Sequence, residues 1–186
     1  MLNVPNCLTG SRLVLGPLFL LLFVAPLGWG GRLACVAIAG LIELSDLFDG
    51  MLARKRGEVT DFGRFLDPFA DSLSRLSIFL AFLATGYAAV WMFAVILYRD
   101  LLVAYVRIWA MRHGVVQAAR LSGKLKAVVQ GVAILVISLG ALAAALTWLD
   151  ATLWRSVARW TMAGVAVVTG LSGVDYVLGL RRIQTK

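Results

Sequence analysis

Four aspartates occur close together in the first half of a chain that is otherwise strongly apolar. Asp46 and Asp49 are followed, after a short basic connection, by Asp67 and Asp71. Spacings of three and four residues place each pair on one face of a helix, because an α-helix turns every ~3.6 residues. Carboxylate oxygens so arranged can hold one or two hard divalent cations, which in turn bind phosphate oxygens. The stretch therefore indicates metal-assisted chemistry on a phosphate-bearing substrate.

The aspartates need compensation in such surroundings. A carboxylate at the centre of a membrane helix costs about 2.5–3.5 kcal/mol, and several carboxylates in one pocket would also repel one another. Bound cations would supply the compensation, and Gly50, Ala53 and Gly63 would leave room for a ligand on the acidic faces. The alternative is an interhelical network in which arginines such as Arg54 and Arg75 neutralise the aspartates without a ligand.

The composition of the chain indicates an integral membrane protein. Hydrophobic residues make up 61% of the 186 residues and charged residues 15%, whereas soluble domains are about 25% charged. The net charge of +8 lies mainly in connections between apolar stretches. Anionic lipid and phosphate-bearing substrates are therefore the expected partners, and nucleic acid is not.

The apolar stretches predict an all-α, polytopic fold in a single membrane domain over residues 1–186, because each span needs about 20 residues. Six transmembrane helices are expected, at 8–28, 32–56, 61–86, 89–113, 122–148 and 152–181. Basic residues gather before the first helix, after the second and fourth, and at the end of the chain. By the positive-inside rule, both termini and the acidic residues lie on the cytoplasmic side of a bacterial-type inner membrane.

The acidic stretch also carries a resemblance to a known family. The segment SDLFDGMLARKRGEVTDFGRFLDPFAD follows the pattern D-x-x-D-G-x-x-A-R, eight residues, G-x-x-x-D-x-x-x-D. The fixed places are filled by Asp46, Asp49, Gly50, Ala53, Arg54, Gly63, Asp67 and Asp71. In this pattern the chain resembles the CDP-alcohol phosphotransferases, whose six-helix membrane domain agrees with the predicted spans.

The resemblance implies a lipid-synthesising transferase that moves a phosphatidyl group from CDP-diacylglycerol to a small alcohol and releases CMP. It implies that the four aspartates bind a pair of Mg²⁺ or Mn²⁺ ions and that Asp71 is also the general base. The positions implied to contact or accommodate the CDP-lipid are Gly50, Ala53, Arg54, Thr60 and Gly63. The opening N-x-P-N-x-x-T-x-x-R also resembles the family and adds Thr9 and Arg12, one helical turn apart, as residues that could contact the diphosphate. A helix start with a positively charged anchor on the cytoplasmic side explains them nearly as well.

The second half of the chain bears on the acceptor. YRD at residues 98–100 and G-K-x-K-x-x-x-Q at residues 123–130 resemble family members that use glycerol 3-phosphate. The candidates for binding the acceptor phosphate are Arg99, Arg107, Lys124 and Lys126, which could equally be charges that set the topology. Asp100 follows Arg99 directly and is expected to point elsewhere around the helix.

Two residues depart from the family pattern. Ser72 replaces a lysine that usually follows the last aspartate, and Asp100 replaces a glutamate. The remaining acidic residues of the spans, Glu43 and Asp175, are expected to pair with arginines such as Arg75 or Arg99.

Other functions remain open on the sequence. The same chemistry could serve inositol phosphate, serine or an aminoalcohol. Intramembrane prenyltransferases also bind magnesium diphosphate, but their aspartate-rich motifs lie far apart. A divalent-cation transporter would need carboxylates near the bilayer midplane with access from both sides. A bundle this small would shield a large polar cavity poorly, and homodimerisation is one way to shield it.

Overall fold

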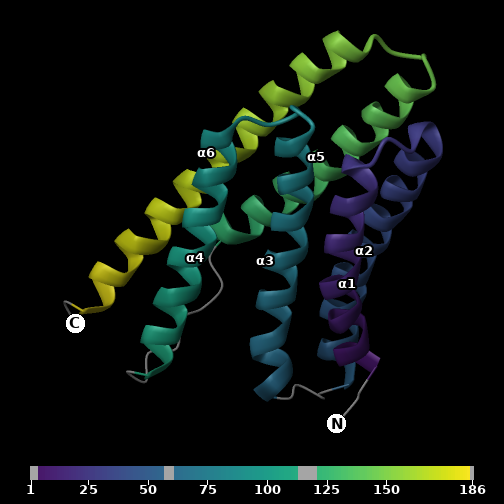
Figure 1. Ribbon diagram of the computed structural model, residues 1–186. Helices are drawn as coiled ribbons and strands as arrows, with labels where there is room; N and C mark the ends of the chain where they lie inside the picture. Colours follow the sequence, from purple (N-terminus) through teal and green to yellow (C-terminus); the bar gives the residue numbers. More distant parts are fainter. Residues whose placement is uncertain (1–3, 57–60, 113–120, 185–186) are drawn as a thin grey trace.

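The computed structural model of the protein is a bundle of α-helices (Figure 1). It describes the backbone of residues 4–56, 61–112 and 121–184, and the side chains of residues 9–45, 68–108 and 121–179. The helices are α1 (Val4–Val24), α2 (Gly28–Arg56), α3 (Asp61–Ala84), α4 (Val90–Arg112), α5 (Leu121–Ala145) and α6 (Ala151–Gln184). The described backbone contains no strand, which confirms the all-helical prediction.

The helices run up and down between two ends of the bundle. Both chain termini lie toward the lower end of Figure 1, as do the end of α2 and the start of α3. The turns that join α1 to α2, α3 to α4 and α5 to α6 lie at the upper end. The acidic motif and the first turns of α1 are therefore at the same end of the bundle.

The first helix boundary differs from the prediction. The sequence predicts helices at 8–28 and 32–56, whereas α1 ends at Val24 and α2 begins at Gly28. Pro26 lacks a backbone N–H and disfavours helical geometry in the residue before it, so α1 cannot continue through it. Gly28 has a φ of 61°, a left-handed conformation that glycine adopts without steric cost. This tight turn starts the second helix one turn earlier than expected.

Close packing of α1 on α3 sets the register of these two helices. A Cβ added at Gly16 would lie 2.6 Å from the Ser74 Cα, so the glycine is what allows the backbones to approach. Above this contact, Phe19 and Phe23 stack with ring centroids 5.2 Å apart, and both meet the edge or face of Phe82. Burial of these aromatic rings contributes several kcal/mol to stability and fixes the position of α1 along α3.

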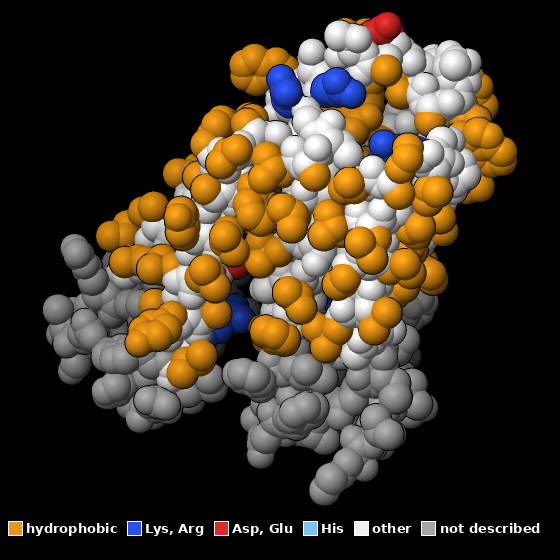
Figure 2. Space-filling view, in the orientation of Figure 1, with side chains coloured by type: hydrophobic (Ala, Val, Ile, Leu, Met, Phe, Trp, Pro, Cys, Tyr) orange, Lys and Arg blue, Asp and Glu red, His pale blue; other side chains and the backbone are white. Residues whose placement is uncertain are grey.

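The outer surface of the bundle is apolar along its middle. Figure 2 shows hydrophobic side chains covering this face, with basic side chains near the upper end and a few charges low between the helices. Leu121–Ala145 and Ala151–Gly179 are long and apolar enough to cross a membrane, with mean hydropathies of 2.3 and 1.5. These two helices meet that criterion within the described residues, and the full set of six spans stays a prediction.

Candidate active site between α1, α3, α4 and α5

Asp71, the expected general base, lies on α3 beside an arginine one turn farther along. Arg75 Nε donates to Asp71 Oδ1 at 2.9 Å, and the Ser74 hydroxyl donates to the Asp71 backbone carbonyl at 3.1 Å. The Asp71 side chain is 29% exposed, whereas Arg75 is only 3% exposed. Within the described part of the chain, no group bonds to the second carboxylate oxygen, Oδ2. Asp71 therefore has one fixed oxygen and one that is open to a substrate or a cation.

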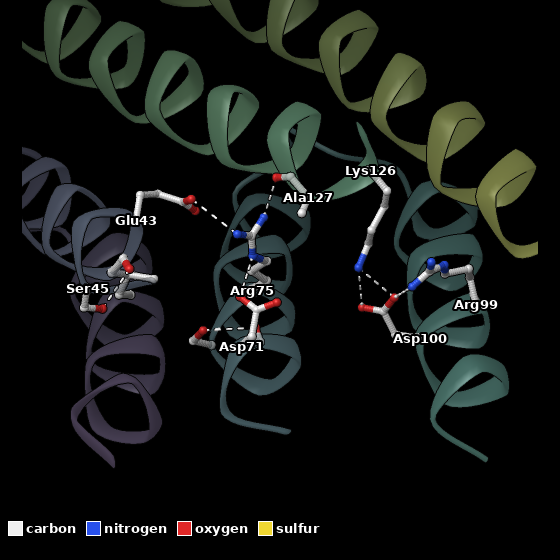
Figure 3. A network of polar contacts seen from close by, with 10 residues as sticks. Glu43, Ser45, Asp71, Arg75, Arg99, Asp100, Lys126 and Ala127 are labelled. Carbon is white, nitrogen blue, oxygen red and sulfur yellow. Dashed lines mark hydrogen bonds and ion pairs between the residues drawn. The ribbon is translucent and has the colours of Figure 1, made fainter. Parts of the chain in front are cut away.

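The same arginine reaches two further helices. Arg75 Nη2 lies 3.3 Å from Glu43 Oε2 on α2, and Nη1 donates to the Ala127 carbonyl of α5 at 2.7 Å (Figure 3). The expectation that Glu43 pairs with an arginine is confirmed. The alternative in which arginines neutralise the aspartates also holds in part, because Arg75 pairs with Asp71.

The register of α1 on α3 places the N-terminal candidates beside the acidic helix. Thr9 and Arg12 are both buried and share a face of α1 with Gly16, which touches Ser74. The two helices rise in the same direction in Figure 1, so one turn below that contact Arg12 is level with the turn that carries Asp71. Thr9 is one further turn down, toward the N-terminal part of α3. Thr9 and Arg12 therefore lie on the face of α1 that packs against α3, the helix of the expected base.

A second ionic network joins α4, α5 and α6. Lys126 Nζ lies 2.8 Å from Asp100 Oδ1 and 3.1 Å from Oδ2, and both residues are buried. Arg99 Nη1 lies 3.0 Å from the same Oδ1, and its Nη2 donates to the Ser172 hydroxyl at 2.7 Å. The expectation that Asp100 points away from Arg99 is wrong, because the Arg99 guanidinium pairs with the Asp100 carboxylate. Gly173 of α6 makes room for the Arg99 side chain, since a Cβ there would lie 2.9 Å from Arg99 Cγ.

The described side chains of the two networks include three cations and three anions. These are Arg75, Arg99 and Lys126, and Glu43, Asp71 and Asp100. In Figure 3, Arg75 lies directly above Asp71, and the pair of Lys126 and Asp100 lies to one side of them. Pairing offsets part of the cost of placing charges in an apolar bundle.

The other two acceptor candidates are exposed. The Arg107 guanidinium carbon lies 6.0 Å from the centre of the Tyr176 ring, and Lys124 lies on the first turn of α5. Asp175 of α6 accepts a hydrogen bond from Ser122 at 2.6 Å. Arg107 and Lys124 are therefore available to a soluble anion, whereas Arg99 and Lys126 already bind Asp100.

Several motif residues lie where the structure describes only the backbone. Asp46, Asp49, Gly50, Ala53 and Arg54 are on α2, and Gly63 and Asp67 are on α3. Thr60 lies outside the described residues. The predicted meeting of the four carboxylates therefore stays a prediction. Among the described side chains, no group of three metal-ligating residues comes together.

Asp71 is suited to a hard cation. Mg²⁺ and Mn²⁺ prefer carboxylate oxygens, usually with water and phosphate completing their shell. Asp71 Oδ2 is such an oxygen, partly exposed and without a bond inside the described chain. The donor at this position fits the metal pair that the family resemblance implies.

Comparison with known proteins supports the same chemistry. The family model described as CDP-alcohol phosphatidyltransferase matches residues 2–171. The chain belongs to this family. The match includes the acidic motif on α2 and α3, the opening segment of α1, and the ionic network of α4 and α5. The protein is therefore an enzyme of the CDP-alcohol phosphatidyltransferase type.

Curated relatives in the family carry names that specify an acceptor. The chain is 37% identical over 181 residues to the probable phosphatidylglycerophosphate synthase of Mycobacterium tuberculosis strain H37Rv, covering 94% of this chain and 80% of that protein. It is 34% identical over 145 residues to the CDP-diacylglycerol--glycerol-3-phosphate 3-phosphatidyltransferase of Bacillus subtilis strain 168. That match covers 72% of this chain and 75% of the relative.

Sequence reasoning missed some members of this phosphatidyltransferase site. Ser172 on α6 holds Arg99, and the Ala127 carbonyl holds Arg75. A signal for the first exists, because Ser172 and Asp175 lie one turn apart in a largely apolar stretch of α6. No sequence signal marks the second, since any residue carries a backbone carbonyl.

Proposed function

We propose that this phosphatidyltransferase transfers the phosphatidyl group of CDP-diacylglycerol to glycerol 3-phosphate and releases CMP. The observation that carries the proposal is the 37% identity across 94% of the chain to a relative named as a phosphatidylglycerophosphate synthase. The exposed cations near the site agree with an acceptor that carries a phosphate.

In the proposed reaction Asp71 is the general base. Its Oδ2 accepts the proton of the acceptor hydroxyl as that oxygen attacks the β-phosphorus of the CDP-lipid. The new oxygen–phosphorus bond forms while the bond from phosphorus to the CMP oxygen breaks, and CMP leaves. The open Oδ2 and the bonded Oδ1 of Asp71 support this assignment. Arg12 would orient the diphosphate from α1, together with Thr9.

Two Mg²⁺ or Mn²⁺ ions held by Asp46, Asp49, Asp67 and Asp71 would polarise the phosphoryl oxygens and stabilise the leaving phosphate. The remaining motif residues would accommodate the cytidine diphosphate, namely Gly50, Ala53, Arg54, Thr60 and Gly63. Gly50, Ala53 and Arg54 lie on α2, and Gly63 lies on α3, the helix that carries Asp71, which supports this role.

For the acceptor, Arg107 and Lys124 are proposed to bind the phosphate, because both side chains are exposed. Arg99 and Lys126 would complete the electrostatic environment. Because both bind Asp100, they would either position the side chains around the acceptor or attract its phosphate at longer range.

We further propose that the chain is a single domain of the bacterial cytoplasmic membrane, crossed by all six helices, with both termini and the active site facing the cytoplasm. The apolar middle of the surface supports this placement. Both termini lie at the end of the bundle that bears the acidic motif, as the charge distribution predicts. A homodimer would shield part of the exposed apolar surface.

CMP release by the purified protein in detergent tests the reaction and the acceptor together. CDP-diacylglycerol and Mg²⁺ are supplied with glycerol 3-phosphate, inositol 1-phosphate or serine in separate reactions, and a reaction without acceptor gives the background. Release with glycerol 3-phosphate alone is expected. Release with another acceptor would keep the chemistry and replace the acceptor, and background release with all three would overturn the proposal.

A further inference from the structure

Arg75 uses all of its nitrogen positions on partners from three helices. Nε bonds to Asp71 within α3, Nη2 pairs with Glu43 of α2, and Nη1 donates to the Ala127 carbonyl of α5. An arginine is suited to this task because its planar guanidinium presents donors in fixed directions. With 3% of its side chain exposed, Arg75 is held by protein rather than by solvent.

Gly131 of α5 completes the arrangement around Arg75. A Cβ added at Gly131 would lie 2.5 Å from Glu43 Oε2 and 2.9 Å from Glu43 Cδ. The missing side chain therefore provides the space in which the Glu43 carboxylate lies. Glu43 is one helical turn before Asp46, so it extends from the same helix that carries the first two motif aspartates.

The bond from Arg75 to the Ala127 carbonyl also connects α3 to α5. Ala127 follows Lys126, whose ammonium binds Asp100 of α4. Arg75 thus joins the base on α3 to the first turns of α5, the helix that carries two of the acceptor candidates. The Ala127 bond ties these two parts of the site together with one buried side chain.

We propose that Arg75 is a positioning residue of the transferase, one that holds Asp71 by Oδ1 so that Oδ2 faces the acceptor hydroxyl and keeps α5 at a fixed distance from the base. This role rests on the proposed function of Asp71. The terminal torsion of an aspartate is broad, so without a partner the carboxylate would sample many orientations. A base held in one orientation reacts faster because misplacement by about 1 Å can cost roughly 100-fold in rate.

Arg75→Gln is the direct test, with kcat and the KM for CDP-diacylglycerol measured separately. We expect kcat to fall by about 10-fold to 100-fold while this KM changes by less than about threefold, because the base is misplaced and the donor contacts remain. Arg75→Lys should recover only part of kcat, since a lysine carries the charge but cannot fork between three partners.

Gly131→Ala gives a second test that removes no charged or polar group. Its methyl group would displace the flexible end of Glu43 and leave Arg75 with one partner fewer. We expect a smaller fall in kcat than for Arg75→Gln, with the thermal unfolding midpoint of the detergent-solubilised protein nearly unchanged. This variant keeps the proposal testable if Arg75→Gln does not fold.

Arg159→Gln is the matched control. Like Arg75, Arg159 donates to a backbone carbonyl of another segment, here from Nε to Gly86 at 2.8 Å, but it lies at the upper end of the bundle. The kcat of Arg159→Gln should equal that of the wild type. Wild-type release of CMP with unchanged kcat in folded Arg75→Gln and Gly131→Ala would overturn the positioning role alone. Absence of CMP release by the wild-type protein would instead overturn the function on which it rests.

Discussion

Lys126 of α5 and Asp100 of α4 form a buried ion pair, with Lys126 Nζ 2.8 Å and 3.1 Å from the two carboxylate oxygens of Asp100. Only 9% of the lysine side chain and 4% of the aspartate side chain are exposed. Arg99, whose side chain is 11% exposed, shares the same carboxylate, so Asp100 is the anion that pairs with both cations. Removing it would leave both cations without their partner.

Asp100→Asn should therefore destabilise the fold strongly. Breaking a buried pair by removing one partner costs about 3–5 kcal/mol, because an uncompensated charge stays behind. The thermal unfolding midpoint in detergent measures this loss. Asp150→Asn is the matched control, because Asp150 is an exposed carboxylate that caps α6 through the Leu153 N–H, and asparagine caps equally well. Equal midpoints for the two variants would contradict the structural role of Asp100.

Asp71→Asn should nearly abolish turnover. The amide keeps the shape of the side chain but cannot accept the proton of the acceptor hydroxyl, and the loss of a general base typically costs about 100-fold to 10,000-fold. Initial rates of CMP release measure the effect, and binding of CDP-diacylglycerol to the variant should persist in part. The role of Asp71 as base would be refuted by a rate near that of the wild type.

Arg107→Ala should raise the KM for glycerol 3-phosphate. A hydrogen bond to a charged group contributes about 1.5–3 kcal/mol, which corresponds to an increase of roughly 10-fold or more. Arg155→Ala is a close control, because Arg155 also lies 6.0 Å from a tyrosine ring, that of Tyr87, and is at the other end of the bundle. If both variants keep the wild-type KM, Arg107 does not bind the acceptor.

Removal of divalent cations should stop CMP release reversibly. Ions held by the proposed carboxylate ligands should be extractable by a chelator, and added metal should restore the rate. Asp46→Asn should raise the metal concentration that gives the half-maximal rate, because the proposed site loses one carboxylate ligand. A rate that is insensitive to EDTA in the wild-type protein would remove the metal pair from the mechanism.

Local features of the sequence were enough to predict the helices and the acidic motif. Long apolar stretches and spacings of three and four residues depend only on helix geometry, so six helices and the helical placement of Asp46, Asp49, Asp67 and Asp71 could be predicted without a tertiary contact. The misplaced end of the first helix also had a local cause, in Pro26. The family followed from the motif, and the comparisons confirmed it.

Tertiary structure decided which partners the charged side chains choose. The bond from Arg75 to the Ala127 carbonyl spans 52 positions in sequence, and the bond from Arg99 to Ser172 spans 73. Such contacts depend on how closely two helices pack and at what height. Here the distance and the register between helices are set by glycines such as Gly16 and Gly131. The role of each glycine can be recognised only when the residue opposite it on the neighbouring helix is known. The sequence alone thus determines the chemistry proposed for the aspartates, and helix packing determines how Asp71 is held by Arg75.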